Sequence, residues 1–324
     1  MKKILITVMS CDKEFFINQE KLIKQTWAKD IIDGKYPNID IVFYMGCPVI
    51  NETYFDDDLK TIVLKCEDDL DNTFKKTIRA FEYIDNNYEY DYIFRTNTST
   101  YVNVQLLNEF IQSITDDNIL YGSEIYSLSE STCPYPLCLF VRGNSIILSK
   151  KHIDILLKDS YPLLYLNLCD DYTIGNIINS YWIKQNIDYT QYIRGVPHGW
   201  YKCTFTEIKN NHSLCTYYNT NTDINFLSQF ITIQIRNYND RSLETKHYLE
   251  LHDLFSTYKL TEKDEAINKV IEYTKNYDIF IGSILGYISI ETWKNIDKHT
   301  LYNIEIQHKA TDDAEFYKKQ KQWI

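Results

Sequence analysis

Glycine and proline are scarce in this chain, with 9 glycines and 6 prolines among its 324 residues. Disordered tails and flexible linkers are typically rich in these residues, so we expect a compact globular protein without an extended tail. Glycine-rich phosphate loops of the GxGxxG and P-loop types are also absent, which argues against a nucleotidyltransferase.

Positive charge is in short supply as well. The chain has 34 lysines and arginines against 45 aspartates and glutamates, a formal net charge of -11. Broad electrostatic binding to nucleic acid relies on a basic face that neutralises phosphates, so we expect no nucleic-acid partner, although local basic patches are still allowed.

Long apolar runs are missing too. The first residues, Met1 to Ser10, place two lysines before an apolar stretch, but this stretch is shorter than a secretory or membrane-spanning segment requires. A buried first strand explains it better. With no signal segment, the eight cysteines are expected to be reduced thiols and not a disulfide framework. Cys133 and Cys138 lack the second Cys pair or paired histidines of a zinc site, so no zinc site is predicted.

Strand-like and helix-like segments alternate through the first two-thirds of the chain. This alternation predicts an α/β fold in which helices flank a mostly parallel, Rossmann-like sheet. Helical spacing marks one stripe from Phe16 to Trp27 and another from Phe74 to Phe81. The predicted strands are Lys3–Met9, Ile39–Met45, Thr61–Leu64, Asp91–Phe94, Cys138–Val141 and a run within Phe226–Ile235.

The end of the chain has a different pattern. Thr261 opens a capping-box-like segment, and an apolar face from Ala266 to Ile271 follows at helical spacing. We therefore predict a main domain over residues 1–245 and a helical appendage over 246–324.

A polar turn follows the predicted strand Asp91–Phe94. Asn97, Thr98 and Ser99 stand at this turn, and a helical stripe from Val104 to Ile114 comes after it. Enzymes that transfer sugars from UDP donors commonly carry three acidic residues at such a turn, and here all three positions are neutral.

Four segments in order resemble the β-1,3-glycosyltransferase and Fringe-like family, whose fold is of the GT-A type. They cover roughly the first 200 residues, and nothing after about Thr204 matches. The segments are Lys21–Trp27, where lysine and glutamine replace the family's arginines; Cys66–Thr77; Phe94–Asn103, with the neutral triplet; and Phe140–Ser149 paired with Asp170–Gly175, which is close to the Fringe-type DDCTIGY.

Asp170 and Asp171 directly precede a stripe at helical spacing from Ile174 to Tyr181. They therefore fall at a helix start, where the helix dipole favours an ionised carboxylate. The resemblance implies that Asp171 is the general base that deprotonates an acceptor hydroxyl, with Asp170 as its orienting partner. A pair of helix caps without chemistry is the alternative.

The neutral turn leaves three hypotheses open, because in the family its acids hold a divalent metal. Asparagine, threonine and serine are poor ligands for a hard cation. The enzyme could work without metal, with arginine or lysine neutralising the diphosphate. It could recruit carboxylates from elsewhere, such as Asp68 or Asp69. It could also be a pseudoenzyme that binds sugar or nucleotide without turnover. We favour the first, with no cofactor required, although Mn²⁺ or Mg²⁺ is still possible.

Further candidate donor contacts are polar or cationic residues at or near the matched segments. Each arginine could equally be an ordinary surface or ion-paired residue. Arg236 is favoured because it follows an apolar strand-like run, and Trp200 is a candidate platform for acceptor sugars. The full set is Arg95, Thr96, Asn97, Thr98, Ser99, Asp69, Arg142, Gly143, His198, Arg236 and Arg241.

The sequence thus predicts inverting transfer from a nucleotide sugar, with UDP-sugar favoured, to a glycan or glycoprotein acceptor. A lectin-like binding module with the same fold is the rival class. The missing signal and membrane segments predict a cytoplasmic protein of a microbe or virus. Donor sugar, linkage and oligomeric state depend on shape rather than on any motif.

Overall fold

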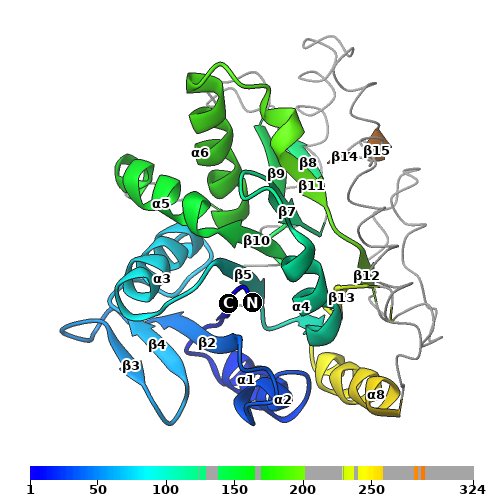
Figure 1. The fold of residues 1–324 in the computed structure, drawn as a ribbon. Coiled ribbons are helices and arrows are strands. Elements are labelled where there is room, and N and C mark those ends of the chain that lie inside the picture. The colour runs from blue at the N-terminus through cyan, green and yellow to red at the C-terminus, as the bar shows by residue number, and fades with distance from the viewer. Residues whose placement is uncertain are drawn as a thin grey trace.

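A computed structural model describes residues 1–123, 125–128, 138–164, 169–200, 228, 230–236, 240–257, 281–283 and 286–288. Its centre is an eight-stranded sheet in the order β11-β7-β10-β5-β1-β2-β4-β3 (Figure 1). The strands are β1 (Ile4–Met9), β2 (Ile39–Gly46), β3 (Tyr54–Asp56), β4 (Thr61–Leu64), β5 (Tyr92–Asn97), β7 (Leu120–Gly122), β10 (Ile146–Ser149) and β11 (Ile193–Gly195).

The sheet is mostly parallel. Its pairings give six strands one direction, and β10 and β3 run against their neighbours. Strand β1 is buried along almost its whole length, as expected of a parallel strand covered on both faces. The α/β fold with a mostly parallel sheet flanked by helices, predicted from the sequence, is confirmed.

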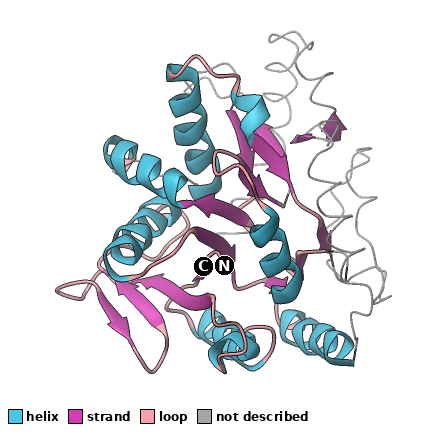
Figure 2. Cartoon of the chain, in the orientation of Figure 1, coloured by secondary structure: helices cyan, strands magenta, loops and turns pink. Residues whose placement is uncertain are grey.

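Helices cover both faces of this sheet (Figure 2). Side chains alternate along β1, so Ile4, Ile6 and Val8 join one core cluster while Leu5 joins the other. The first cluster includes residues of α1 (Glu14–Gln25), α2 (Lys29–Ile32), α4 (Val104–Ser113) and α8 (Leu243–Thr257). The second includes α3 (Thr73–Asn87), α5 (Lys150–Asp159) and α6 (Asp170–Lys184).

Two smaller sheets complete the described structure. One has the order β12-β13-β6, from β12 (His198–Trp200), β13 (Thr232–Gln234) and β6 (Thr100–Val102). The other has the order β15-β14-β8-β9, from β15 (Gly286–Ile288), β14 (Ile281–Ser283), β8 (Ile125–Leu128) and β9 (Cys138–Val141). Short 3-10 turns lie at Tyr161–Leu163 and Tyr189–Tyr192.

The predicted elements of the first 200 residues are found close to their expected bounds. Thr61–Leu64 and Cys138–Val141 are strands as predicted, and α6 begins at Asp170, the first residue of the predicted acidic pair. The run Phe226–Ile235 contains a shorter strand, β13, and this strand joins a small sheet instead of the main one.

Helix α6 lies very close to β9 because of one glycine. A Cβ atom on Gly175 would come within 2.4 Å of the Phe140 Cβ, nearer than two such atoms can approach. The glycine of the segment Asp170–Gly175 thus lets the helix pack on the strand. This packing sets the position of Asp170 and Asp171, at the start of the helix, relative to the strand.

The predicted boundary between residues 245 and 246 falls inside α8, which runs from Leu243 to Thr257. The helix predicted after Thr261 lies outside the described residues. The expectation that 246–324 is helical holds for α8, but β14 and β15 lie in the same range, so this part of the chain is not helical throughout. Strand β14 pairs with β8, a contact between distant segments that no local pattern in the sequence indicates.

Four cysteines fall among the described side chains, and Cys11, Cys47, Cys66 and Cys169 are all free, as predicted for reduced thiols. None of the helices in the described part of the chain combines the length and the apolar character that crossing a bilayer requires.

Candidate active site

The candidate residues collect at the edge of the main sheet where the parallel strands end. Strand β1 pairs with β2 on one side and β5 on the other, so the chain winds outward in two directions from β1. Open α/β sheets bind ligands in the crevice at such a switch point, beyond the carboxyl ends of the strands. Residues after β1, β4 and β5 therefore meet at one place.

A buried ion pair forms the floor of this edge. Arg95 of β5 is 1% exposed, and its guanidinium pairs with the Asp170 carboxylate at the start of α6. A closed ring of hydrogen bonds supports the pair: Arg95 Nε donates to the Tyr44 hydroxyl at 3.3 Å, Tyr44 donates to the Thr77 hydroxyl at 3.1 Å, and Thr77 donates to Asp170 Oδ2 at 3.2 Å. Each hydroxyl in the ring donates once, so the donor directions are fixed.

The ion pair changes the interpretation of two predicted residues. Arg95 was predicted as a cation for the donor's diphosphate, but the structure directs its charge to Asp170 within the core. Burial is the largest influence on Arg95 and opposes its charge, but Asp170, Tyr44 and Asp171 together outweigh burial and raise the pKa of the guanidinium. Asp170 is thereby held in one position beside Asp171, as the predicted orienting partner would be.

Asp171 is half-buried next to this pair. Its Oδ1 accepts from the backbone N–H of Tyr172 at 2.8 Å, and its Oδ2 accepts from the N–H of Gly143 at 3.1 Å. Burial and the negative charge of Asp170 raise the pKa of Asp171, while the N–H groups and Arg95 act against that rise. The sequence predicted that the helix dipole keeps this carboxylate ionised, but it gave no sign of burial, which is the largest cause of the raised pKa. A raised pKa strengthens a carboxylate as a proton acceptor.

Gly143 is required for this arrangement. A Cβ atom at this position would lie 2.9 Å from Arg95 Nη1 and 3.3 Å from Asp171 Oδ2. A larger residue would therefore push against both charged groups. Gly143 was predicted as a contact of the donor substrate, and in the structure its backbone N–H binds the carboxylate of Asp171.

The neutral turn after β5 is a hydrogen-bonded unit. Asn97 Oδ1 accepts from the backbone N–H of Ser99 at 3.1 Å and from the Ser99 hydroxyl at 2.9 Å. The Thr100 hydroxyl, which has one proton to donate, lies 3.1 Å from Asn97 Oδ1 and 3.0 Å from Gln234 Oε1. Gln234 of β13 donates from Nε2 to Ser99 Oγ at 3.0 Å. Thr96, Thr98, Ser99 and Thr100 are buried, and Asn97 is partly exposed.

His198 joins the same network from β12. One ring nitrogen lies 2.9 Å from the Thr232 hydroxyl and the other lies 3.2 Å from Asn144 Nδ2. Asn144 also donates to Gln234 Oε1 at 3.3 Å, and its carbonyl accepts from the Thr96 hydroxyl at 2.7 Å. The structure thus brings together the turn and His198, which the sequence analysis selected separately as candidate donor contacts.

Residues 143 and 144 connect the two halves of the site. Gly143 contacts Asp171, while the next residue, Asn144, contacts the turn and His198. Sequence reasoning missed Asn144 and Gln234, although Asn144 stands next to a selected glycine and Gln234 lies within a selected apolar run. Tyr44 gave no signal, because it is one of 28 tyrosines and lies within a buried strand.

The other predicted residues lie in varied settings. Arg241 forms a two-pronged contact with Glu244, at 2.9 and 3.2 Å, and its guanidinium lies 4.4 Å from the centre of the Phe15 ring. Asp69 is exposed and accepts from the backbone N–H of Asn72 just before α3. Arg142 and Arg236 are half-buried. The side chain of Trp200 lies outside the described residues.

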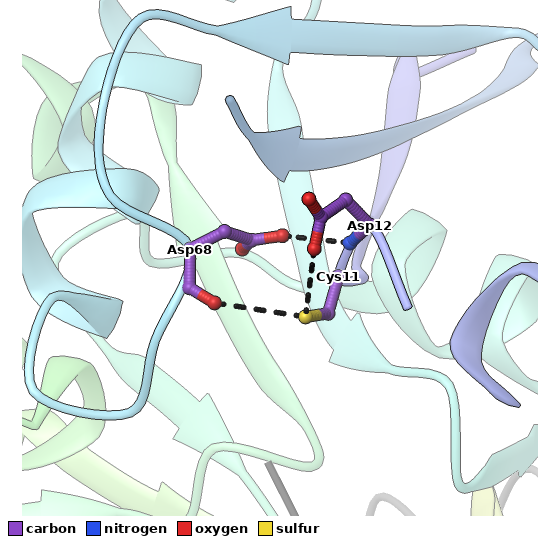
Figure 3. A group of neighbouring side chains, drawn as sticks. All are labelled: Cys11, Asp12 and Asp68. Atoms are coloured by element: carbon purple, nitrogen blue, oxygen red, sulfur yellow. Dashed lines mark hydrogen bonds between the residues drawn. The ribbon is translucent and has the colours of Figure 1, made fainter. Parts of the chain in front are cut away.

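Asp68, the predicted source of a recruited carboxylate, stands with Cys11 and Asp12 (Figure 3). Its carboxylate accepts from the Asp12 N–H at 2.7 Å and pairs with the buried ammonium of Lys76 at 2.6 Å. Burial raises the pKa of the Cys11 thiol to about 11, which disfavours the thiolate form that binds metals. The charge of Asp68 is thus matched by Lys76, and the group fits a lysine-bridged loop better than a metal centre.

Comparisons with known proteins give limited similarity. No known family and no curated protein sequence matches the chain. Among solved structures, a glycosyltransferase involved in the glycosylation of the major capsid of PBCV-1 is similar at a TM-score of 0.42 and 11% identity, over 76% of this chain and 98% of that one. The galactosyltransferase LgtC, in complex with donor and acceptor sugar analogs, is similar at a TM-score of 0.38 and 10% identity, over 81% of this chain and 99% of that one.

Proposed function

We propose that this protein is a GT-A type glycosyltransferase that moves a sugar, with inversion, from a nucleotide sugar to a hydroxyl of a glycan or glycoconjugate. The observation that carries this proposal is the position of Asp171. Its carboxylate is half-buried at the switch-point edge, is held by two backbone N–H groups and has a raised pKa. The sequence resemblance to the Fringe-like family supports the same role, and UDP is the nucleotide that this resemblance favours.

In this reaction Asp171 accepts the proton of the acceptor hydroxyl as that oxygen attacks the anomeric carbon of the donor. The bond between the anomeric carbon and the diphosphate breaks at the same carbon, and its electron pair leaves with the nucleoside diphosphate. Asp170, fixed by Arg95, Tyr44 and Thr77, keeps the base in place. The neighbouring negative charge also favours proton uptake by Asp171.

A divalent metal, which the family uses at the turn, does not fit the residues present. Asn97, Thr98 and Ser99 offer no carboxylate, and the Asn97 side-chain oxygen already accepts hydrogen bonds from the N–H and the hydroxyl of Ser99. We therefore propose a metal-independent enzyme in which a cation such as Arg236 offsets the charge of the diphosphate. Ile235 supports this placement, because its N–H donates to the carbonyl of Ser99 at 3.0 Å and Arg236 is the next residue.

The test compares the wild type with Asp171→Asn in an assay of UDP release from a panel of UDP-sugars, with a glycan mixture as acceptor. Loss of the base should lower the rate by about 10²–10⁴-fold. Asp154→Asn, at an exposed position of α5, removes a similar charge and should leave the rate unchanged. Because the pKa of Asp171 is raised, the acid limb of the pH-rate profile should lie above the ordinary aspartate range.

Two results would contradict the proposal. Equal rates for the wild type and Asp171→Asn would remove Asp171 from the mechanism. Binding of a nucleotide sugar by a wild-type protein that transfers nothing would favour the alternative of a binding protein without turnover.

A further inference from the structure

The orientation of the Asn97 amide is fixed by chemistry. A backbone N–H can only donate, so the Asn97 atom that lies 3.1 Å from the N–H of Ser99 must be the oxygen. The amide nitrogen Nδ2 therefore points away from the N–H of Ser99. Nδ2 has no hydrogen-bond partner among the described residues. The buried polar atoms that lack a partner do not include Nδ2, so this nitrogen is accessible at the surface. The turn therefore presents a hydrogen-bond donor outward.

The oxygens around this donor are used within the protein. The Ser99 hydroxyl donates to Asn97 and accepts from Gln234. The Tyr248 hydroxyl of α8 contacts the carbonyls of Thr98 and Thr100 at 2.6 and 2.8 Å, and the Ser99 carbonyl accepts from Ile235. A divalent cation needs several oxygen ligands, and among the side-chain oxygens of residues 97–99 only the hydroxyl of Thr98, a residue 2% exposed, makes no hydrogen bond to the described part of the chain.

His198 does not offer a nitrogen lone pair to a metal either. Its two ring nitrogens face the Thr232 hydroxyl and Asn144 Nδ2. Because the amide of Asn144 donates to it, that ring nitrogen is the acceptor, and the other carries the proton towards Thr232. The histidine thus orders the network and leaves the outward-facing role to Asn97.

We propose that the turn is a direct diphosphate subsite, in which Asn97 Nδ2 donates to a phosphate oxygen and the turn binds no divalent cation. This inference rests on the proposed function for the identity of the donor substrate. The hydrogen-bond network around the turn consists of uncharged amide, imidazole and phenol groups, those of Gln234, Asn144, His198 and Tyr248. An anion can therefore approach Asn97 without meeting a carboxylate on these side chains.

The substitution Asn97→Asp tests this arrangement on the full chain. An aspartate keeps an oxygen for the N–H of Ser99 but replaces the outward-facing amide NH2 group with a second carboxylate oxygen. Pyrophosphate and UDP, each titrated by calorimetry in EDTA, should bind the wild type, and Mn²⁺ should not change their affinity. For Asn97→Asp in EDTA the affinity should fall about tenfold or more, since a donor is exchanged for a negative charge, and Mn²⁺ should restore it.

Asn86→Asp, at the exposed end of α3, is the matched control and should behave as the wild type. Failure of pyrophosphate to bind the wild type in EDTA would overturn the inference, and so would an affinity that rises with Mn²⁺ or one that Asn97→Asp leaves unchanged. Pyrophosphate binding does not depend on sugar transfer, so these outcomes are separate from those of the Asp171→Asn assay.

Discussion

At the scale of single residues, the main feature of the site is a buried ion pair. Arg95 is one of the largest fully buried side chains, and both members of its pair with Asp170 are nearly inaccessible. Such a pair adds little net stability when both ions are present, because each ion has lost its water. Its effect is positional, since any movement of one partner would leave the other charge uncompensated next to Asp171.

We expect Arg95→Met to lower the free energy of unfolding by about 3–5 kcal/mol, because Asp170 would be left as an unpaired buried charge. Urea denaturation at neutral pH measures this value. Arg79→Met is the control: Arg79 pairs with Glu82 on the surface, with side chains 43% and 39% exposed, and its loss should cost at most about 1 kcal/mol. A similar cost for the two variants would show that Asp170 does not depend on Arg95 as its buried partner.

At the scale of elements, helix α5 of the second core cluster has a well-defined N-terminal cap. Helix α5 begins after Ser149 with a reciprocal cap, in which His152 Nδ1 accepts from the Ser149 N–H at 3.2 Å. His152 Nε2 then carries the proton and donates to the Asn118 carbonyl at 3.0 Å. This tautomer requires a neutral ring, and burial lowers the pKa of His152 to about 4.

This cap predicts a loss of stability in acid. The unfolded His152 takes up a proton near pH 6.5, whereas the folded one does so only near pH 4, so stability falls as the pH drops between these values. The full effect is about 3 kcal/mol, at about 1.4 kcal/mol per pH unit. Urea midpoints measured from pH 7 to pH 4 should show a smaller decline for His152→Gln than for the wild type. His252→Gln, on α8, controls for the loss of an imidazole, and an equal decline in all three proteins would contradict the assignment.

At the scale of the whole molecule, the sheet brings distant segments to one edge. The base is at position 171, its N–H partner at 143, the turn at 97–99 and the residues that bind the turn at 234 and 248. Helix α8 belongs to this assembly, because the Tyr248 hydroxyl lies within hydrogen-bond distance of the Thr98 carbonyl in the turn and the Thr100 carbonyl in β6. A ligand at the edge should therefore stabilise the whole chain.

Thermal unfolding with nucleotide sugars measures this coupling. A ligand present at 100 times its dissociation constant adds about 2.7 kcal/mol, which should raise the melting temperature by several degrees. We expect one UDP-sugar to give this shift, of equal size in EDTA and in Mn²⁺. Protein with EDTA or Mn²⁺ alone is the baseline. A shift that occurs only with Mn²⁺ would contradict metal independence.

Parts of this site follow from local patterns and parts do not. The turn after β5, the start of α6 at Asp170 and the core-facing stripe of α3 were predicted, because each depends on periodicity or capping within a short segment. The antiparallel direction of β10 and the strands β14 and β15 were not, because partner strands decide them. The roles of Tyr44, Asn144 and Gln234 likewise depend on segments far apart in the chain.

The sequence alone determined the α/β layering, the neutral character of the turn and the placement of two carboxylates at a helix start. These properties depend on side-chain period and residue type, which any short segment carries by itself. Only the tertiary structure decided which charges meet. Arg95 could have faced a phosphate or a carboxylate, and the packing of α6 on the sheet paired it with Asp170. The same packing placed the Asp171 carboxylate beside the switch-point edge. Its pKa depends on burial and on contacts between distant segments, which no short segment determines by itself.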